Sequence, residues 1–542
     1  MTKTLYTNGR FFDGHSGFGH MDNTSLATRD LRGKLVLPAF VDAHCHLMML
    51  GESLEKVDVF QCKSMNEVIT CLQRYQEDNP TKQRILARNW MQNMDESEMF
   101  DRKYIDERIT KPVYIMSFDL HSCLCNSAAL KEIGIDESTP DPSGGELVRT
   151  VENGKQRLTG WLKEMACINF VAPTIRDLTS QAEKEAHLDK AFDTLLAAGY
   201  TAVGDLLMEE EVFAMLASRV KRDGRLPIHV SAYWHCSPED DIEKSIKHII
   251  RAKELQQEWQ NNEWLQVKGI KLVVDGVIDS CTATLSLPYQ NGSNAEPLWP
   301  FEKLQRAIKE ADKRDLQCAI HAIGDEAVHI TVKALSSLGR ERIMKNRHRI
   351  EHLELTHEAD VEQIGVLNIT ASIQPVHSDP EITQNWFKQL GGNQSATEDQ
   401  SPDRRCCRAF AYNDFLQKGA PIAIGTDAPT APFWPLPNLY NAHSRCSALN
   451  PSLDLRTTPQ YALPLLDSVL AASNGAAKAC HLDHILGDFA KGKLADFNIL
   501  DIDFFAEVDK ESNNKKAILR AKVVNTFQAG IEVAKDGKLL HK

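Results

Sequence analysis

The sequence lacks any long apolar run. No stretch of its 542 residues approaches the roughly 18 consecutive apolar residues that a membrane-spanning helix requires. Its first residues, MTKTLYTNGRFF, also lack the apolar core and the small-residue cleavage site of a secretory signal. We therefore expect a soluble, cytoplasmic protein that has no membrane partner.

The sequence also lacks the cysteine spacing of a structural zinc site. Its 13 cysteines include no CxxC pair, and an odd number of cysteines spread over a long chain argues against a disulfide framework. Basic residues are in deficit, with 62 Lys and Arg against 75 Asp and Glu and a formal net charge of -13. This balance argues against nucleic acid or an anionic membrane as the main partner.

From about residue 180 the sequence alternates helical segments with short apolar runs. With the opening run Leu35–Leu47 these runs number eight, and the other seven are Thr201–Asp205, Pro227–Trp234, Gly269–Asp275, Gln317–His321, Arg349–His352, Ile369–Pro375 and Pro421–Asp427. The alternation predicts βα units, and eight of them predict an α/β fold with a closed, TIM-type (β/α)8 barrel. The alternative, a doubly wound open sheet, needs a Gly-rich phosphate loop after an early strand, which this sequence lacks.

The two ends of the sequence differ from the middle. Residues 1–35 and 485–542 contain short strand-like segments with turn signals such as Asp13-Gly14 and Asp536-Gly537. We expect both ends to form one small β-sandwich domain, with the barrel of residues 36–484 inserted between them. A segment at about 55–190 interrupts the barrel after its first strand and is predicted to be a large insertion.

Polar residues stand at the ends of several predicted strands. Residues two positions apart in a strand point to the same face, so His44 and His46 can together hold one divalent cation. Four further polar residues lie within or at the end of later apolar runs, namely Lys271, His321, His352 and Asp427. The carboxyl ends of barrel strands are where active sites lie, and neutral imidazoles with a carboxylate suit zinc and related metals.

A lysine in this set is informative. Lysine is normally cationic, but a desolvated amine near metal cations loses its proton more readily. The free amine of Lys271 can then take up carbon dioxide to give a carbamate, an anion able to bridge two metals.

Six ordered motifs carry a resemblance to a known family. VDAHCHL, GIKLVVDG, HAIGD, RIEH, SIQPVH and IGTDAP together resemble the amidohydrolase superfamily, and specifically amidohydrolase family 3, which includes N-substituted formamide deformylases. The resemblance covers nearly the whole chain. It implies a metal-dependent hydrolase of carbon–nitrogen bonds other than peptide bonds, with two divalent metal ions, zinc in the first instance, in each subunit.

The resemblance also implies a role for each ligand. The strand-one pair His44 and His46 and the strand-eight Asp427 would bind one ion, and carboxylated Lys271 would bridge to a second. The remaining ligands of the second ion would be His321 and His352.

The implied mechanism is attack of a metal-bound hydroxide on the carbonyl carbon of an amide, N-formyl group or cyclic amide. Asp427 would take the proton and pass it to the leaving nitrogen. The segment FDLHSCLCNSAAL resembles a family motif of histidine plus asparagine, so His121 and Asn126 are candidate substrate-binding residues. Asp275 and His377 are further candidates, and for Asp275 the alternative is to orient a metal-bound histidine.

Two other functions remain open. The first alternative to the hydrolase is a non-catalytic regulatory or binding protein on an amidohydrolase scaffold, because a fold does not fix a function. The second is a mononuclear-metal deaminase of the same superfamily. The complete ligand set favours a hydrolase over the first, and Lys271 argues against the second. We expect a small-molecule substrate, whose identity the sequence does not give, and the oligomeric state stays open, a homo-oligomer included.

Overall fold

The structure, a computed structural model, describes residues 4–15, 18–19, 27–91, 100–117, 122–142, 145–152, 154–392, 404–510 and 514–540. The chain divides into two compact units. The first comprises Met1–Leu47 and Phe192–Lys542, and the second comprises Met48–Ala191. Among the described helices, none is both long enough and apolar enough to cross a membrane.

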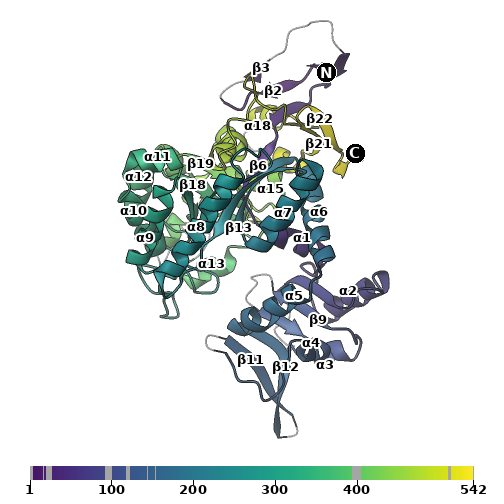
Figure 1. The fold of residues 1–542 in the computed structure, drawn as a ribbon. Coiled ribbons are helices and arrows are strands. Elements are labelled where there is room, and N and C mark those ends of the chain that lie inside the picture. Colours follow the sequence, from purple (N-terminus) through teal and green to yellow (C-terminus); the bar gives the residue numbers. More distant parts are fainter. Residues whose placement is uncertain are drawn as a thin grey trace. The chain divides into compact units, whose positions relative to one another are not determined.

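Eight parallel strands form the centre of the first unit (Figure 1). In sheet order they are β6 (Phe40–Cys45), β13 (Tyr200–Met208), β14 (His229–His235), β15 (Leu265–Val273), β16 (Gln317–Ala322), β17 (Arg349–His352), β18 (Thr370–Ile373) and β19 (Ile422–Ile424). A bridge between Cys45 and Ala428 brings the first strand to the end of the last. The sheet is therefore a nearly closed barrel, and the predicted TIM-type α/β fold is confirmed.

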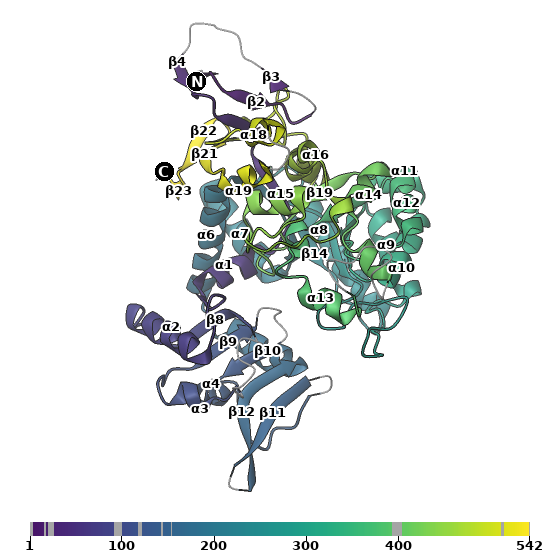
Figure 2. The same ribbon diagram turned by 180° about the vertical axis from the view of Figure 1, so that it is seen from behind.

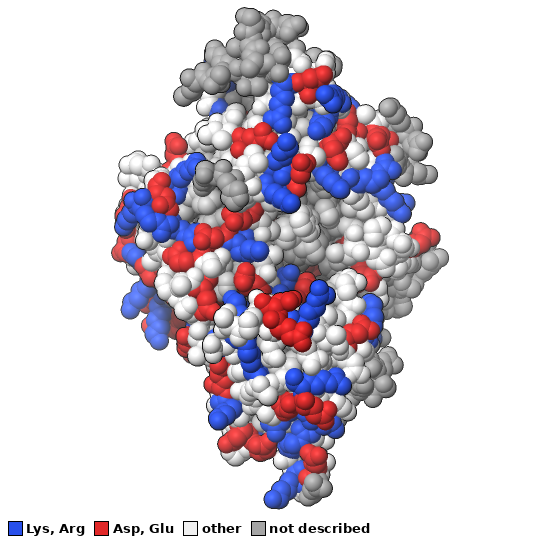
Figure 3. Space-filling view, turned by 90° about the vertical axis from the view of Figure 1, so that its right-hand side faces the viewer, with Lys and Arg blue, Asp and Glu red and all other residues white. Residues whose placement is uncertain are grey.

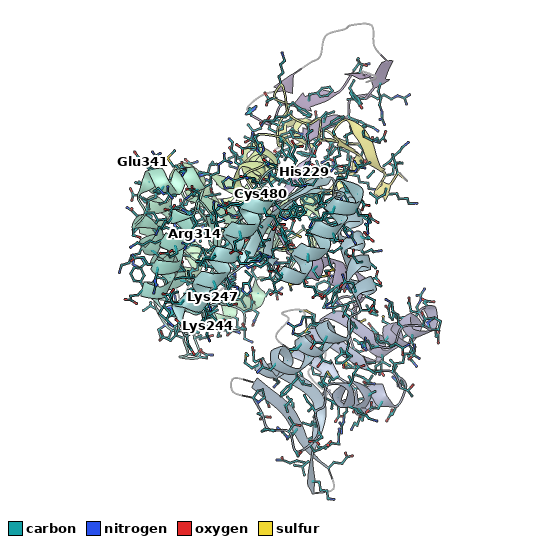
Figure 4. The ribbon with its side chains drawn as sticks, viewed as in Figure 1. His229, Lys244, Lys247, Arg314, Glu341 and Cys480 are labelled. Atoms are coloured by element: carbon teal, nitrogen blue, oxygen red, sulfur yellow. The ribbon has the colours of Figure 1, made fainter. Side chains whose placement is uncertain are left out.

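Helices cover the outside of this barrel (Figures 1 and 2). Among them are α7 (Glu210–Asp223), α8 (Ile242–Glu258), α9 (Phe301–Lys313), α10 (Asp325–Ser336) and α12 (Glu358–Leu367). The boundary between the two units falls within α6 (Gln181–Ala198), whose last residues, from Phe192, belong to this unit. In α8 the buried residues include Ile246, Ile249 and Leu255, at helical spacing, whereas Lys244 and Lys247 on the other face are exposed (Figure 4). The apolar stripe of α8 thus packs on the barrel.

The described part of the first unit contains further helices. They are α11 (Arg340–Asn346), α13 (Gln384–Gln389), α14 (Tyr412–Gln417), α15 (Pro435–Ser444), α16 (Leu465–Leu470), α17 (Ala476–Ala479), α18 (Phe504–Lys510) and α19 (Ala517–Arg520). Cys480, just after α17, accepts a hydrogen bond from the hydroxyl of Ser231 in β14 through its carbonyl (2.7 Å). Figure 4 labels Cys480 and His229, the first residue of β14, at the end of the barrel where the strands begin.

The apolar run Leu35–Leu47 forms two strands in two different sheets, where the sequence predicts one. β5 (Leu35–Pro38) pairs antiparallel with β20 (Phe497–Leu500), and β6 starts the barrel two residues later. The chain changes sheets at Ala39, whose N–H donates to the carbonyl of Asp496, while the next N–H, of Phe40, donates to Gly199. Both strands are buried throughout, so the sequence stays apolar across the change.

Strands from both ends of the chain meet in one seven-stranded sheet, in the order β23-β22-β21-β20-β5-β2-β3. Its other members are β2 (Arg10–Phe12), β3 (Phe18–Gly19), β21 (Val523–Gln528), β22 (Ile531–Lys535) and β23 (Lys538–Leu539). β1 (Thr4–Thr7) and β4 (Ala27–Asp30) form a separate parallel pair. The two chain ends therefore contribute strands to one sheet. The small β-sandwich domain expected for residues 1–35 and 485–542 stays a prediction.

The second unit contains its own six-stranded sheet. Its strands are, in order, β11 (Gly145–Glu152), β12 (Lys155–Glu164), β10 (Ser122–Cys125), β9 (Val113–Ser117), β8 (Ile85–Trp90) and β7 (Val57–Asp58). Its helices are α1 (Leu47–Glu55), α2 (Met65–Asp78), α3 (Lys103–Asp106), α4 (Ser127–Glu132) and α5 (Ala172–Leu178). Val68, Ile69 and Leu72 of α2 pack with Trp90 in one apolar cluster. The insertion predicted at about 55–190 falls in this unit.

Candidate metal centre

The carboxyl ends of the barrel strands bring a cluster of polar side chains together. It contains all six residues that the sequence proposes as ligands, namely His44, His46, Lys271, His321, His352 and Asp427. Four of the six are buried, and two, His46 and His321, are partly exposed. A cluster of this kind at the strand ends is the arrangement that the sequence predicts for the barrel.

His44, His46 and Asp427 form the tightest group. Asp427 Oδ1 lies 3.1 Å from Nε2 of His44 and 2.8 Å from Nε2 of His46. Asp427 follows β19 with a φ of 58°, and its N–H donates to the carbonyl of His44 (2.7 Å). One ligand atom from each of the three residues can serve a single metal ion.

Gly425 allows this approach of the last strand to the first. A Cβ at this position would lie 2.5 Å from both the Cβ and the backbone nitrogen of His44. Any side chain at residue 425 would therefore push His44 away from Asp427, which explains why the motif IGTDAP needs a glycine two residues before the carboxylate.

Asp42 and Thr426 join the same two strands from behind the ligands. Asp42 is fully buried, and its carboxylate accepts hydrogen bonds from the hydroxyl of Thr426 (2.6 Å) and from the N–H groups of Thr426 (2.9 Å) and His44 (3.1 Å). Burial is the largest cause of the raised pKa of Asp42, about 7. These hydrogen bonds thus tie the segments that carry His44 and Asp427 to the side chain of Asp42.

This contact gives a first prediction, for Thr426→Val. Valine has the shape of threonine but lacks the donor, which leaves Asp42 Oδ2 without its 2.6 Å partner in a buried position. We expect the free energy of unfolding to fall by about 1–3 kcal/mol, measured by denaturant titration. Thr426→Ser keeps the hydroxyl and serves as the matched control; equal stability of the two variants would contradict the role of this hydrogen bond.

Lys271, His321 and His352 lie beside the first group. Lys271 Nζ is 3.3 Å from Nε2 of His44, and burial is the main reason that the pKa of Lys271 falls to about 8. The rings of His321 and His352 have their centroids 4.2 Å apart. His321 can donate its Nε2–H to the carbonyl of Gly276 at 3.1 Å, which leaves Nδ1 free for a ligand bond.

The protonation states of this cluster suit a metal ion. Burial, followed by the charge of Lys271, lowers the pKa of His321 to about 3, and burial likewise lowers the pKa values of His44 and His352. These imidazoles are therefore neutral at neutral pH and keep a lone pair for a cation. Among the described residues, Nδ1 of His46 and Nδ1 of His352 are buried without a hydrogen-bond partner. The donor set therefore fits a divalent ion of the zinc type.

His377 occupies a position next to the ligands. It lies in the 3-10 turn Pro375–Ser378, and its Nε2 is 3.7 Å from Asp427 Oδ2. His352, His377 and Asp427 form a second group whose ligand atoms are close enough to share a metal ion. His377, predicted from the sequence as a substrate-binding residue, is therefore placed for contact with either a metal ion or a substrate.

Sequence reasoning missed the carboxylates behind these histidines. Glu351 Oε2 lies 2.8 Å from Nδ1 of His44, and Glu354 Oε1 lies 3.1 Å from Nδ1 of His377. Glu354 also accepts a hydrogen bond from Trp386 Nε1 (2.9 Å). Burial lowers the pKa of His377, but the adjacent Glu354 outweighs it and leaves this pKa raised. Carboxylates in this position orient imidazole rings.

The other predicted substrate-binding residues have different surroundings. Asp275 is buried and accepts N–H groups from Thr284 (3.1 Å), Ile323 (3.0 Å) and Gly324 (2.8 Å). Its Oδ1 is 3.6 Å from Nε2 of His321, which agrees with the alternative that it orients a ligand. A substrate contact for Asp275 remains a prediction.

Asn126 lies in the second unit, where it caps α4. Its Oδ1 accepts from the N–H groups of Val113 and Ala129, and its Nδ2 donates to the carbonyls of Ile109 and Lys111. These four contacts use both ends of the buried side-chain amide and give Asn126 a structural role; a substrate contact for Asn126 stays a prediction. His121 lies outside the described residues.

Three comparisons place this chain among known proteins. A model described as the amidohydrolase family matches residues 27–540. Protein LONG AFTER FAR-RED 3 of Arabidopsis thaliana is 28% identical over 512 residues, which cover 92% of this chain and 82% of that protein. N-substituted formamide deformylase of Arthrobacter pascens is 22% identical over 490 residues, or 88% of this chain and 84% of that enzyme. The crystal structure of an uncharacterized metal-dependent hydrolase from Pyrococcus horikoshii OT3 aligns with a TM-score of 0.70 and 24% identity over 92% of this chain and 97% of its own, which shows a shared fold.

Proposed function

Since this chain belongs to the amidohydrolase family, we propose that it is a metal-dependent hydrolase that cleaves a carbon–nitrogen bond in an amide, an N-formyl compound or a cyclic amide. The single observation that carries the proposal is the contact of one carboxylate oxygen of Asp427 with both His44 and His46 at the carboxyl ends of the barrel strands. The family membership agrees with the resemblance that the six sequence motifs carry.

Asp427 is the residue that moves protons. Burial raises its pKa, but the neighbouring imidazoles of His44 and His46 outweigh burial and hold this pKa well below its ordinary value. Asp427 is therefore ionised and able to accept a proton. Its Oδ1 faces the two histidines, so Oδ2, with His377 at 3.7 Å, is the oxygen that takes the proton of the attacking water and returns it to the leaving nitrogen.

The metal centre is proposed to hold two zinc ions. His44, His46 and Asp427 would bind one, and His321 and His352 the other, with Lys271 between them as a carbamate. The lowered pKa of Lys271, about 8, leaves part of the amine uncharged near neutral pH. That amine adds carbon dioxide with loss of one proton. When bound, the metal lowers the pKa of water and polarises the substrate carbonyl.

The predicted substrate is a small molecule. On the face drawn in Figure 3, described Lys and Arg residues alternate with Asp and Glu, in a chain whose formal net charge is -13. A mixed, mildly acidic surface suits a small substrate better than a nucleic acid.

The test is metal analysis of the purified protein, followed by a screen of N-acyl and N-formyl compounds with the metal-loaded protein. We expect divalent metal close to two ions per chain and release of an amine together with a carboxylic acid. One ion per chain with release of ammonia would favour the deaminase. A metal-free protein that does not respond to added zinc would overturn the proposal and leave the non-catalytic alternative.

A further inference from the structure

Two charged side chains lie inside the barrel behind the metal ligands. Arg349 and Glu351 are adjacent inward-facing residues of β17, and neither has any exposed surface. Arg349 Nε donates to Glu351 Oε1 (2.6 Å), and Nη2 donates to Glu351 Oε2 (2.9 Å). A buried charge needs such a partner, because an unpaired one costs several kcal/mol.

Further contacts hold Arg349 in place. Its Nη2 also donates to the carbonyl of Ala43 (2.9 Å) and to the hydroxyl of Ser372 (2.5 Å), on the two strands β6 and β18. Its guanidinium lies over the ring of Tyr233, 5.5 Å from the centroid. Arg349 thus contacts three other strands of the barrel, β6, β14 and β18, and it holds Glu351 in turn.

The carboxylate of Glu351 decides where the proton of His44 resides. Glu351 Oε2 is 2.8 Å from Nδ1 of His44, which is closer than the amide nitrogen of Gln374 at 3.3 Å. A neutral imidazole has one N–H, and a carboxylate paired with arginine only accepts. The N–H of His44 therefore sits on Nδ1, and Nε2 carries a lone pair.

That lone pair faces another acceptor. Nε2 of His44 is 3.1 Å from Asp427 Oδ1, so a lone pair and a carboxylate oxygen meet, and Lys271 Nζ, 3.3 Å from the same Nε2, is the cationic group beside them. The contact is unfavourable unless a cation lies near both atoms. The lone pair of His44 is thus directed to a position where a cation, either the Lys271 ammonium or a bound metal ion, offsets the charge of Asp427.

We infer that Glu351 is a positioning residue that makes Nε2 of His44 available to the metal, with Arg349 as its fixed counter-charge. The inference deepens the proposed function, because it concerns the metal site on which that function rests. It assigns a purpose to a buried ion pair that the hydrolytic steps themselves do not use.

Glu351→Gln tests this inference. Arg349 has only donors, so it claims the amide oxygen of the new glutamine, and the amide NH2 then turns toward His44. His44 Nδ1 would have to accept, which moves its proton to Nε2, where the metal binds. We expect affinity for Zn²⁺ and Co²⁺ to fall about 10- to 100-fold, measured by competition with a chromophoric chelator, with an altered visible spectrum of the cobalt protein.

Asp312→Asn is the matched control. Asp312 Oδ1 lies 3.1 Å from Nε2 of His348, so the pair repeats the carboxylate–imidazole contact in the same unit. His348 precedes β17, whereas the metal ligands lie at the carboxyl ends of the strands. We expect this variant to lose stability but to keep the metal affinity of the unmodified protein. Circular dichroism and thermal unfolding establish that both variants are folded.

The outcomes separate this inference from the proposed function. If the unmodified protein binds metal and hydrolyses a substrate while Glu351→Gln binds metal equally well, the positioning role is overturned and the function stands. If Glu351→Gln and Asp312→Asn lose affinity alike, the effect is a general loss of structure and the role is overturned as well. Weakened binding in Glu351→Gln alone supports the role, even where none of the screened compounds is hydrolysed. A protein that binds no divalent ion overturns both.

Discussion

Asp427→Asn is expected to remove turnover while leaving most of the metal bound. Asparagine keeps the size of the side chain and an oxygen that can face His44 and His46, but it cannot accept and return a proton. General acid–base catalysis contributes about 10²- to 10⁴-fold, so kcat should fall by at least about 100-fold. Metal content by elemental analysis and kcat on the best substrate of the screen are the two measurements.

Asp312→Asn again supplies the comparison, because it also removes the charge of a buried aspartate that contacts a histidine. This histidine, His348, precedes β17, whereas the metal ligands lie at the carboxyl ends of the strands. Its turnover should stay close to that of the unmodified protein. Near-native turnover of Asp427→Asn would remove this residue from the reaction. Loss of the metal together with activity would instead make Asp427 chiefly a ligand.

The barrel and the ligand set could be predicted from the sequence because both follow from local patterns. Apolar runs alternate with helical segments, and a histidine, lysine or aspartate stands out where an apolar run should contain none. His321 and His352, for example, lie 31 positions apart in sequence, yet their rings lie at the ends of adjacent strands with centroids 4.2 Å apart. Parallel pairing of neighbouring strands is sufficient to bring them together.

The residues that orient the ligands follow no such local pattern. Glu351 and His44 are separated by 307 positions, and Glu354 and Trp386 by 32, so their contacts depend on how the strand ends close on one another. One signal was nevertheless present in RIEH. Arg349 and Glu351, two positions apart in an otherwise buried strand, point to the same side and cannot remain unpaired there. A charged pair inside a barrel strand can thus mark the support of a metal site.

The change of sheet within Leu35–Leu47 could not be predicted, for a different reason. Both β5 and β6 are buried along their whole length, so an apolar run continues from Leu35 to Val41 across the change of sheet. The two strands differ in their partners. β5 pairs with β20, from the C-terminal part of the chain, whereas β6 pairs with β13. Since the apolar pattern records burial and not the identity of the neighbouring strand, it shows one continuous run.

The second large effect concerns stability: added metal is expected to stabilise the unmodified protein much more than it stabilises His46→Ala. A ligand that binds only the folded state adds about 4 kcal/mol at a thousandfold excess over Kd. His46 contacts Asp427 Oδ1 at 2.8 Å, so its removal deletes a ligand; because its side chain is only 12% exposed, each variant's gain is measured against its own metal-free stability. We expect a gain smaller by about 3 kcal/mol if affinity falls a hundredfold.

Thermal or denaturant unfolding of chelator-treated protein, with and without Zn²⁺, measures this gain. His329→Ala is the control, because His329 on α10 also contacts a carboxylate, that of Asp360 at 3.1 Å, but its side chain is 50% exposed. Any binding of metal to the unfolded chain is shared by both variants and cancels in the comparison. An equal gain in His46→Ala and His329→Ala would show that the stabilising ion binds elsewhere. A gain reduced only in His46→Ala ties an ion to the strand-end pair that the sequence pattern HCH first indicated.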